Sequence, residues 1–282
     1  MCGLVGVMGT ITHREKQAFK WLLHFDATRG EHSTGVLAVS PDNATQVFKE
    51  LGTSAFLYQK YPQEFPKGVY DKPAKVLMGH NRFATQGEIV AENAHPFEFE
   101  NVIGARNGTV AEWNTKKLHM ADAFKIDSQK LYSQLNHDAD VQKLWDHLED
   151  GQGSAASLTY WDKRDNSMNF VRSSQRPMHF AVTKDTQTLF WASEKWMLQV
   201  ACANSGVQIQ DIESSEINQH YRVVFKDNKL IVSKKAVEPK KWFVTYSSGA
   251  MGYGNIPKPA AKFIDLRIDH IVQDGIQPTR IS

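Results

Sequence analysis

The spacing of apolar and polar residues along the chain predicts two groups of β-strands. The first group consists of short stretches rich in apolar residues, at 4–8, 35–39, 45–49, 75–78 and 102–105. The second group follows in the second half of the chain, at 154–161, 167–171, 179–182, 188–192, 221–225 and 229–232. Turn-forming residues separate two of the strand pairs, Pro41-Asp42-Asn43 in the first group and Asp227-Asn228 in the second.

Apolar residues three and four positions apart predict helices at 16–25, 127–135, 141–148 and 194–203. Strands that come in two groups, with helices between and after them, favour a layered α/β or α+β domain over alternating βαβ units. The periodicity is lost after about Lys235, where Pro and Gly become frequent. We therefore interpret 1–235 as one domain and 236–282 as an irregular C-terminal tail, with a short strand or helical turn near 263–272.

Composition narrows the class of protein. The 282 residues are 41% hydrophobic and 23% charged, as is usual for a globular domain, and 33 Lys and Arg face 31 Asp and Glu. A net charge of +2 argues against a protein dedicated to nucleic acid or to a membrane surface. The apolar N-terminal stretch is short and has no charged residues before it, and no long apolar run follows, so we expect neither a signal peptide nor a spanning helix. The expected location is the cytoplasm.

The chain has only two cysteines, Cys2 and Cys202, so no disulfide framework is expected. Cys202 lies on an apolar helical pattern and is interpreted as a buried structural thiol. No His-x-x-x-His or Cys-x-x-Cys pair and no Walker-type phosphate loop is present, and we expect neither a metal nor a cofactor.

Cys2 is the first candidate for chemistry. If the initiator Met is removed, Cys2 carries a free α-amine, whose pKa of about 7.7–8.0 leaves a neutral fraction at physiological pH. That amine can act, directly or through a water, as the base for the thiol on the same residue. The alternative is a small apolar residue that opens a strand, and it is the more common situation for a cysteine taken alone.

Three further polar segments follow predicted strands or open a predicted helix. Within 79–87, Arg82 and Thr85 could bind a carboxylate, or Arg82 could be an ordinary surface arginine. Asn107-Gly108 is a common hairpin turn, but an Asn amide with a neighbouring backbone N–H could also form an oxyanion hole. Asp127 opens a predicted helix, where an N-cap is the simplest role.

Taken together and in this order, the segments resemble the glutaminase domain of the class II glutamine amidotransferases, which are N-terminal-nucleophile hydrolases. The motifs that carry the resemblance are Cys2-Gly3-Leu4-Val5-Gly6, Arg29-Gly30-x-x-Ser33-x-Gly35, Gly79-His80-x-Arg82-Phe83-Ala84-Thr85-x-Gly87, Asn93-Ala94-His95-Pro96, Asn107-Gly108 and Asp127-Ser128-Gln129. The resemblance runs from Cys2 to about Ala203. It implies an α+β fold, a four-layer αββα sandwich in which two antiparallel sheets lie between helical layers.

The resemblance also implies a glutaminase reaction. Cys2 would attack the side-chain amide of glutamine as a thiolate, with its own amine as the base. Asn107 and the backbone N–H of Gly108 would form the oxyanion hole. The products would be a γ-glutamyl thioester and ammonia, and the thioester would then be hydrolysed to glutamate.

The remaining roles that the resemblance implies concern the amino-acid end of glutamine. Arg82 would bind the α-carboxylate, with help from Thr85 and from loop amides near Gln86, and Asp127 would bind the α-ammonium. Supporting positions are Arg29, Phe83 and His95. The chain departs from the family pattern at Gln86, at His32 and at Arg106, which replaces a His often found before the Asn-Gly pair.

Family members usually continue into a domain that uses the ammonia, whereas about eighty residues follow the motif-bearing part here. We therefore expect the ammonia acceptor to be bound by a separate synthetase or acceptor-binding subunit, or ammonia to be released. Whether the chain forms a homo-oligomer is open. Two alternatives also stay open: hydrolysis of another amide such as a γ-glutamyl peptide, and a non-catalytic regulatory protein with this fold.

Overall fold

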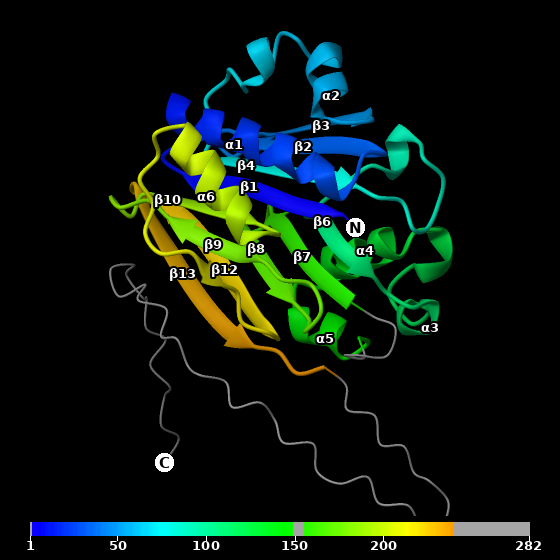
Figure 1. Ribbon diagram of the computed structural model, residues 1–282. Helices are drawn as coiled ribbons and strands as arrows, with labels where there is room; N and C mark the ends of the chain where they lie inside the picture. Colours follow the sequence, from blue (N-terminus) through cyan, green and yellow to red (C-terminus); the bar gives the residue numbers. More distant parts are fainter. Residues whose placement is uncertain (1, 149–154, 240–282) are drawn as a thin grey trace, which may run out of the picture.

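The computed structural model describes residues 2–148 and 155–239, and it contains two antiparallel sheets that lie face to face (Figure 1). The seven-stranded sheet has, in spatial order, β11 (Glu213–Ser214), β9 (His179–Val182), β10 (Thr188–Ala192), β1 (Gly3–Gly9), β4 (Val76–Arg82), β2 (Ser33–Val39) and β3 (Thr45–Leu51). The six-stranded sheet has β13 (Lys229–Ala236), β12 (Gln219–Lys226), β8 (Ser167–Arg172), β7 (Ala155–Asp162), β6 (Val102–Thr109) and β5 (Phe97–Glu98).

Helices cover the outer faces of both sheets (Figure 1). The seven-stranded sheet is covered by α1 (His13–Asp26), α2 (Ser54–Lys60) and α6 (Lys195–Asn204). The six-stranded sheet is covered by α4 (Asp127–His137) and α5 (Val141–Trp145), with the short α3 (Glu112–Thr115) beside α4. The predicted α+β sandwich is therefore confirmed. None of the helices within 2–148 and 155–239 is long and apolar enough to cross a membrane.

Three apolar clusters account for the four layers. Side chains of α1 and α6, such as Phe19 and Leu198, pack on the outer face of the seven-stranded sheet. Side chains between the sheets, such as Leu4 and Trp161, form the central cluster. Side chains of α4 and α5 pack on the outer face of the six-stranded sheet. Residues of one strand alternate between two clusters, as expected for the two-residue period of a strand that is buried on both faces.

The predicted strands are present, several of them longer than the sequence pattern indicated, and the extensions of β4 and β6 bear on the candidate site. β4 continues to Arg82 and β6 continues to Thr109, so residues 79–82 of the first polar motif and Asn107-Gly108 lie within strands. The hairpin-turn interpretation of Asn107-Gly108 is wrong, because these residues pair with Ser157 and Ala156 of β7. The short elements α2, α3, β5 and β11 have no counterpart in the sequence prediction.

The C-terminal prediction is only partly within the described residues. β13 extends to Ala236, one residue beyond the expected end of the domain, and the description stops at residue 239. Most of the expected irregular tail, including the short element expected near 263–272, lies outside the described residues. The boundary between domain and tail therefore stays a prediction.

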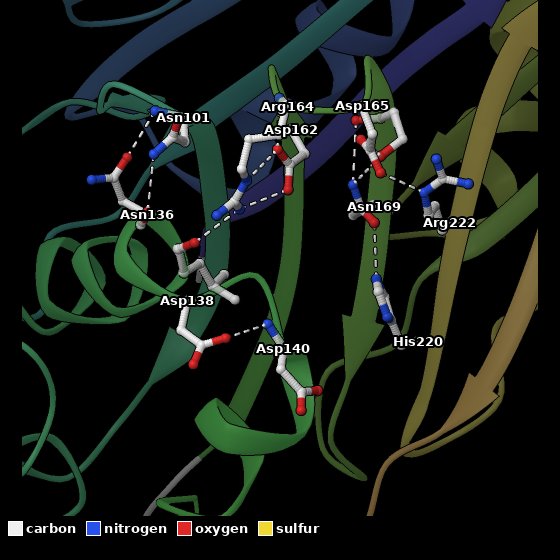
Figure 2. A network of polar contacts seen from close by, with 12 residues as sticks. Asn101, Asn136, Asp138, Asp140, Asp162, Arg164, Asp165, Asn169, His220 and Arg222 are labelled. Carbon is white, nitrogen blue, oxygen red and sulfur yellow. Dashed lines mark hydrogen bonds and ion pairs between the residues drawn. The ribbon is translucent and has the colours of Figure 1, made fainter.

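Polar contacts fix α4 against the six-stranded sheet at the end of the helix that is remote from Asp127 (Figure 2). The N–H of Asn101 donates to Asn136 Oδ1 at 2.8 Å, and Asn101 Nδ2 donates to the Asn136 carbonyl at 3.1 Å. Arg164 donates to the Leu135 carbonyl at 3.0 Å and binds Asp162 through two nitrogens. Because these contacts anchor one end of the helix, they also restrict where its first residue, Asp127, lies.

The close approach of β6 and α4 depends on a glycine. A Cβ on Gly104 would lie 2.1 Å from Cε1 of Tyr132, a side chain of α4 that is fully buried. The hydroxyl of Tyr132 donates to the Ala105 carbonyl at 2.6 Å. The tyrosine therefore fills the space over Gly104 and is held there by the strand itself.

We expect Gly104→Ala to lower the free energy of unfolding by about 1–3 kcal/mol, because the added methyl group overpacks a site filled by Tyr132. Urea denaturation measures this change. The same substitution should cost less in a Tyr132→Leu background, in which the obstructing ring is absent. An equal cost in both backgrounds would contradict the assignment of the strain to Tyr132.

Candidate active site

Cys2 lies directly before β1, half-buried at the edge of the space between the sheets. Its sulfur is 3.4 Å from both the backbone N–H and the carbonyl oxygen of Phe83, the first residue after β4. Burial raises the pKa of the Cys2 thiol, and the Phe83 backbone and the charge of Arg106 oppose this change. At rest the thiol is therefore held in its protonated form by desolvation.

Arg29 holds the backbone at Cys2. It ends the short 3-10 helix after α1, and its Nε donates to the Cys2 carbonyl at 3.1 Å. Its guanidinium also forms an ion pair with Glu194, the residue before α6. The charge of Arg29 is thus paired with an anion, and the residue lies next to Cys2, where a supporting position was predicted.

Asn107 and Gly108 lie on β6, which packs against β1 across the central core. Figure 1 shows this end of β6 close to the N-terminus. The Asn107 side chain is buried, and its Nδ2 has no hydrogen-bond partner among the described residues. Gly108 has φ +123°, and a Cβ there would lie 1.9 Å from the Ala155 carbonyl oxygen, so only glycine fits. The strand thus presents an unpaired buried donor next to a glycine.

Arg82 is the last residue of β4, and the loop that follows folds back over its guanidinium. Nη2 donates to the Gln86 carbonyl at 2.6 Å, and Nη1 donates to the Glu88 carbonyl at 3.0 Å. Thr85 is exposed on the same loop, with its hydroxyl 3.3 Å from that of Thr109 at the end of β6. Burial lowers the pKa of Arg82. The predicted carboxylate-binding residues are therefore together, with the arginine occupied by backbone carbonyls.

Asp127 is buried at the start of α4 and already has several partners. Its Oδ2 accepts from the Val110 N–H at 2.9 Å, and its Oδ1 accepts from the Ser128 N–H at 2.8 Å. Arg106 forms an ion pair with Oδ1 at 2.7 Å and donates to the Ser128 hydroxyl at 3.0 Å. The simple N-cap role is wrong, because Ile126 is the N-cap residue and has no side-chain cap.

Two histidines of the motifs pack against each other in the core. The rings of His80 and His95 are 4.2 Å apart, and both are buried. Burial lowers the pKa of His80 to about 3 and the pKa of His95 well below its usual value, so both rings are neutral at physiological pH. His32, at one of the departures from the family pattern, accepts from the Ala84 N–H at 2.9 Å and stacks on Phe83.

Sequence reasoning missed one titratable group beside the nucleophile. Asp26, the last residue of α1, is fully buried and accepts two hydrogen bonds from Asn81. It continues the spacing of Phe19, Leu22 and Leu23 on the packed face of the helix, and a carboxylate at such a core position could have marked it. Within 2–148 and 155–239 there is no group of three or more His, Cys, Asp or Glu residues that could hold a metal ion.

Comparison with known proteins places this geometry in context. No protein-family model matches the chain. The chain is 28% identical over 210 residues to the glutamine–fructose-6-phosphate aminotransferase (isomerizing) of Halalkalibacterium halodurans, a match that covers 71% of this chain and 33% of the relative. The resemblance to the class II glutamine amidotransferases is confirmed. The protein of the same name from Staphylococcus aureus strain Mu50 is 26% identical over 243 residues, covering 82% of this chain and 37% of the relative.

Solved structures of amidotransferases share the fold. The glutamine phosphoribosylpyrophosphate amidotransferase of B. subtilis, complexed with ADP and GMP, has a TM-score of 0.59 and 16% identity, over 83% of this chain and 49% of that one. A solved allosteric regulatory enzyme of purine biosynthesis has a TM-score of 0.63 and 18% identity, over 84% and 50%. The chain spans about a third of the length of the amidotransferases it matches in sequence.

We expect Arg106→Gln to lower the free energy of unfolding by about 3–5 kcal/mol, because it leaves the buried carboxylate of Asp127 without its cation. Urea denaturation measures the loss. The matched control is Arg222→Gln, which breaks a half-exposed ion pair with Asp165 (Figure 2) and should cost at most about 1 kcal/mol. A loss for Arg106→Gln no larger than that of the control would contradict a structural role for the buried pair.

Proposed function

We propose that the chain is a glutaminase of the class II amidotransferase type, which releases ammonia from glutamine through a thioester on Cys2. The proposal is supported by a thiol directly before β1 and an unpaired buried amide donor on β6, the strand that packs against β1 from the other sheet. The similarity to two glutamine–fructose-6-phosphate aminotransferases supports glutamine as the substrate. The observation that carries most weight is the unpaired Asn107 Nδ2, because buried donors are almost always satisfied.

In the proposed reaction, the thiol proton of Cys2 moves to the α-amine of the same residue, and the sulfur attacks the δ-carbon of glutamine. The negative charge that develops on the amide oxygen is stabilised by Asn107 Nδ2 and the Gly108 N–H. The amine returns the proton to the leaving nitrogen, so ammonia departs and the thioester remains. Water then adds to the thioester with the amine as base. Glutamate is released, and the thiol of Cys2 is regenerated.

The amino-acid end of glutamine would be bound by Arg82 and Asp127. The α-carboxylate would bind N–H groups of the Arg82 guanidinium other than the two that donate to the Gln86 and Glu88 carbonyls. Thr85 stands at the same loop and can add a hydroxyl donor. The α-ammonium would approach Oδ2 of Asp127, because Oδ1 is committed to Arg106 and Ser128.

The destination of the ammonia belongs to the same proposal. The relatives of known name are about three times as long as the matched region. We propose that the described domain supplies ammonia to an acceptor-binding domain or subunit. The two alternatives, another γ-glutamyl amide as the substrate and a non-catalytic role, are kept as outcomes of the first experiment below.

Purified protein whose Met1 has been removed, as verified by mass spectrometry, should release glutamate from glutamine. Cys2→Ala should abolish this release, because the thioester has no sulfur. Cys202→Ala is the matched control: Cys202 is buried in α6, where burial raises its pKa to about 12, and the variant should stay active. Better turnover of γ-glutamyl peptides than of glutamine would replace glutamine as the substrate. No amide hydrolysis by the processed protein, together with a cellular role that Cys2→Ala leaves intact, would support the non-catalytic alternative.

A second expected outcome concerns the oxyanion hole. Asn107→Ala should lower kcat by about 10²–10³-fold with a small change in KM, because the amide donates to charge that exists only in the transition state. Steady-state kinetics of glutamate release measures both constants. Asn169→Ala, which removes another buried asparagine of the six-stranded sheet (Figure 2), should leave kcat nearly unchanged. Similar kcat losses in both variants would mean that Asn107 acts through stability alone.

A further inference from the structure

The carboxylate of Asp26 is a buried group for which neither the fold nor the proposed reaction accounts. It ends α1 on the face that packs against the seven-stranded sheet, and the residue has no exposed surface. Aspartate is almost never buried to this extent unless it is paired. The position is therefore costly, and it calls for a partner of some kind.

The two oxygens of Asp26 have different surroundings. Oδ2 accepts from the backbone N–H of Asn81 at 3.2 Å and from its Nδ2 at 3.0 Å. Oδ1 is buried and has no hydrogen-bond partner among the described residues. The Asn81 side chain is itself fixed, since its Oδ1 accepts from the Thr34 hydroxyl at 2.7 Å. The carboxylate is thus held by one oxygen, and the other oxygen is left with its acceptor capacity unused.

The unused oxygen lies against the residue that follows the nucleophile. A Cβ on Gly3 would be 1.6 Å from Asp26 Oδ1, so the oxygen is in contact with the backbone of β1 at that point. Consecutive Cα atoms are about 3.8 Å apart. The α-nitrogen of Cys2 is therefore one peptide unit away from the place where this oxygen contacts Gly3. The charge of Asp26 also acts, as a minor contribution, to raise the pKa of the Cys2 thiol.

The charged groups around Asp26 do not fully compensate a negative charge on its carboxylate. Arg29 is nearby, but its charge is shared with Glu194, whose own carboxylate opposes it at Asp26. From β4 the facing side chain is the neutral Asn81, and from β1 the residue in contact is Gly3, which has no side chain. Burial raises the pKa of Asp26 to about 7, so the group changes charge in the range in which an α-amine also begins to titrate.

We propose that Asp26 Oδ1 accepts a hydrogen bond from the α-amine of Cys2 once Met1 has been removed, so that Asp26 is the positioning residue for the base. The inference rests on the proposed function only in that Cys2 becomes the N-terminal residue. When the thiol transfers its proton to the amine, the resulting ammonium lies against a carboxylate that stabilises it. The carboxylate does not take the proton; it orients and supports the group that does, as the third member of a catalytic triad does.

The experiment uses the chain's two cysteines. The processed protein is labelled with ¹³C-cysteine, and the Cα resonance of Cys2 is followed with pH, which reports the titration of the α-amine. Cys202, buried in α6, gives the only other labelled resonances and serves as an internal check on folding. We expect Asp26→Asn to lower the midpoint of the amine by about one pH unit, a tenfold loss of proton affinity, because the neighbouring anion is gone.

The control variant is Asp42→Asn, which removes the same charge from an exposed turn and should leave the midpoint unchanged. If Asp26→Asn does not fold, Asp26→Leu supplies the apolar side chain that the face of α1 favours and should shift the midpoint in the same direction. An unchanged midpoint in a folded variant would overturn the proposal, since a purely structural Asp26 does not alter the amine.

The outcome is separable from that of the proposed function. A shifted midpoint in a protein that does not hydrolyse glutamine would keep the contact and refute the glutaminase. Hydrolysis with an unshifted midpoint would keep the glutaminase and refute the contact. If Asp26→Asn is active, the acid limb of its pH–kcat profile should also move to lower pH. A lower pKa means that the α-amine is already unprotonated, and able to act as a base, at that lower pH.

Discussion

The buried ion pair between Arg106 and Asp127 determines how the second sheet, the helix above it and the polar site fit together. Arg106 is on β6, directly before Asn107, and Asp127 is the first residue of α4. Taking two charges out of water is expensive, and the cost is offset only where further hydrogen bonds complete the pair. Here Ser128 and the Val110 N–H supply them. Since α4 is also anchored at its other end, the position of β6 relative to the helix is fixed at two points.

The same pair sets the electrostatics of the site. Arg106 and Arg82 are both buried cations near Cys2, and Asp127 compensates only one of them. His80 and His95 add no charge, because burial keeps their rings neutral. The surroundings of Cys2 therefore favour the approach of an anion such as a carboxylate or a developing oxyanion. The α-ammonium of a bound amino acid has only Oδ2 of Asp127 to approach, because Oδ1 is committed to Arg106 and Ser128.

Much of this fold could be predicted from the sequence because its strands are buried on both faces and read as short apolar runs. β9 and β10 have the bounds that the pattern indicates. The lengths of β4 and β6 were underestimated because their last residues include polar side chains that are buried at the site. A polar stretch of this kind has the same sequence pattern as a loop. Asn107-Gly108 shows the limit clearly, since the local turn preference of Asn-Gly is overridden by pairing with β7, a partner about fifty residues away.

The order of the motifs was enough to predict which residues belong to the candidate site, but not which contacts they make. Sequence reasoning singled out Arg82 and Asp127, but their partners come from a loop that folds back and from a neighbouring strand. Asp26 was missed because its environment is made by β1 and β4, which lie more than fifty residues apart in the chain. Contacts at such sequence separations are a property of the packed sheet and are invisible to local patterns.

These surroundings constrain how Cys2 can become a nucleophile. Burial raises the pKa of its thiol, and the Phe83 backbone and Arg106 only partly offset this effect, so a resting thiolate is not what the packing favours. The proton must then leave during the reaction, to a base within reach of the sulfur. Burial lowers the pKa of the two motif imidazoles, His80 and His95, which makes them poor proton acceptors, and Nδ1 of His32 already accepts from the Ala84 N–H. The α-amine of Cys2 satisfies both requirements, and it is free only if the peptide bond to Met1 has been cut, so processing of the N-terminus is a chemical condition of the proposed reaction.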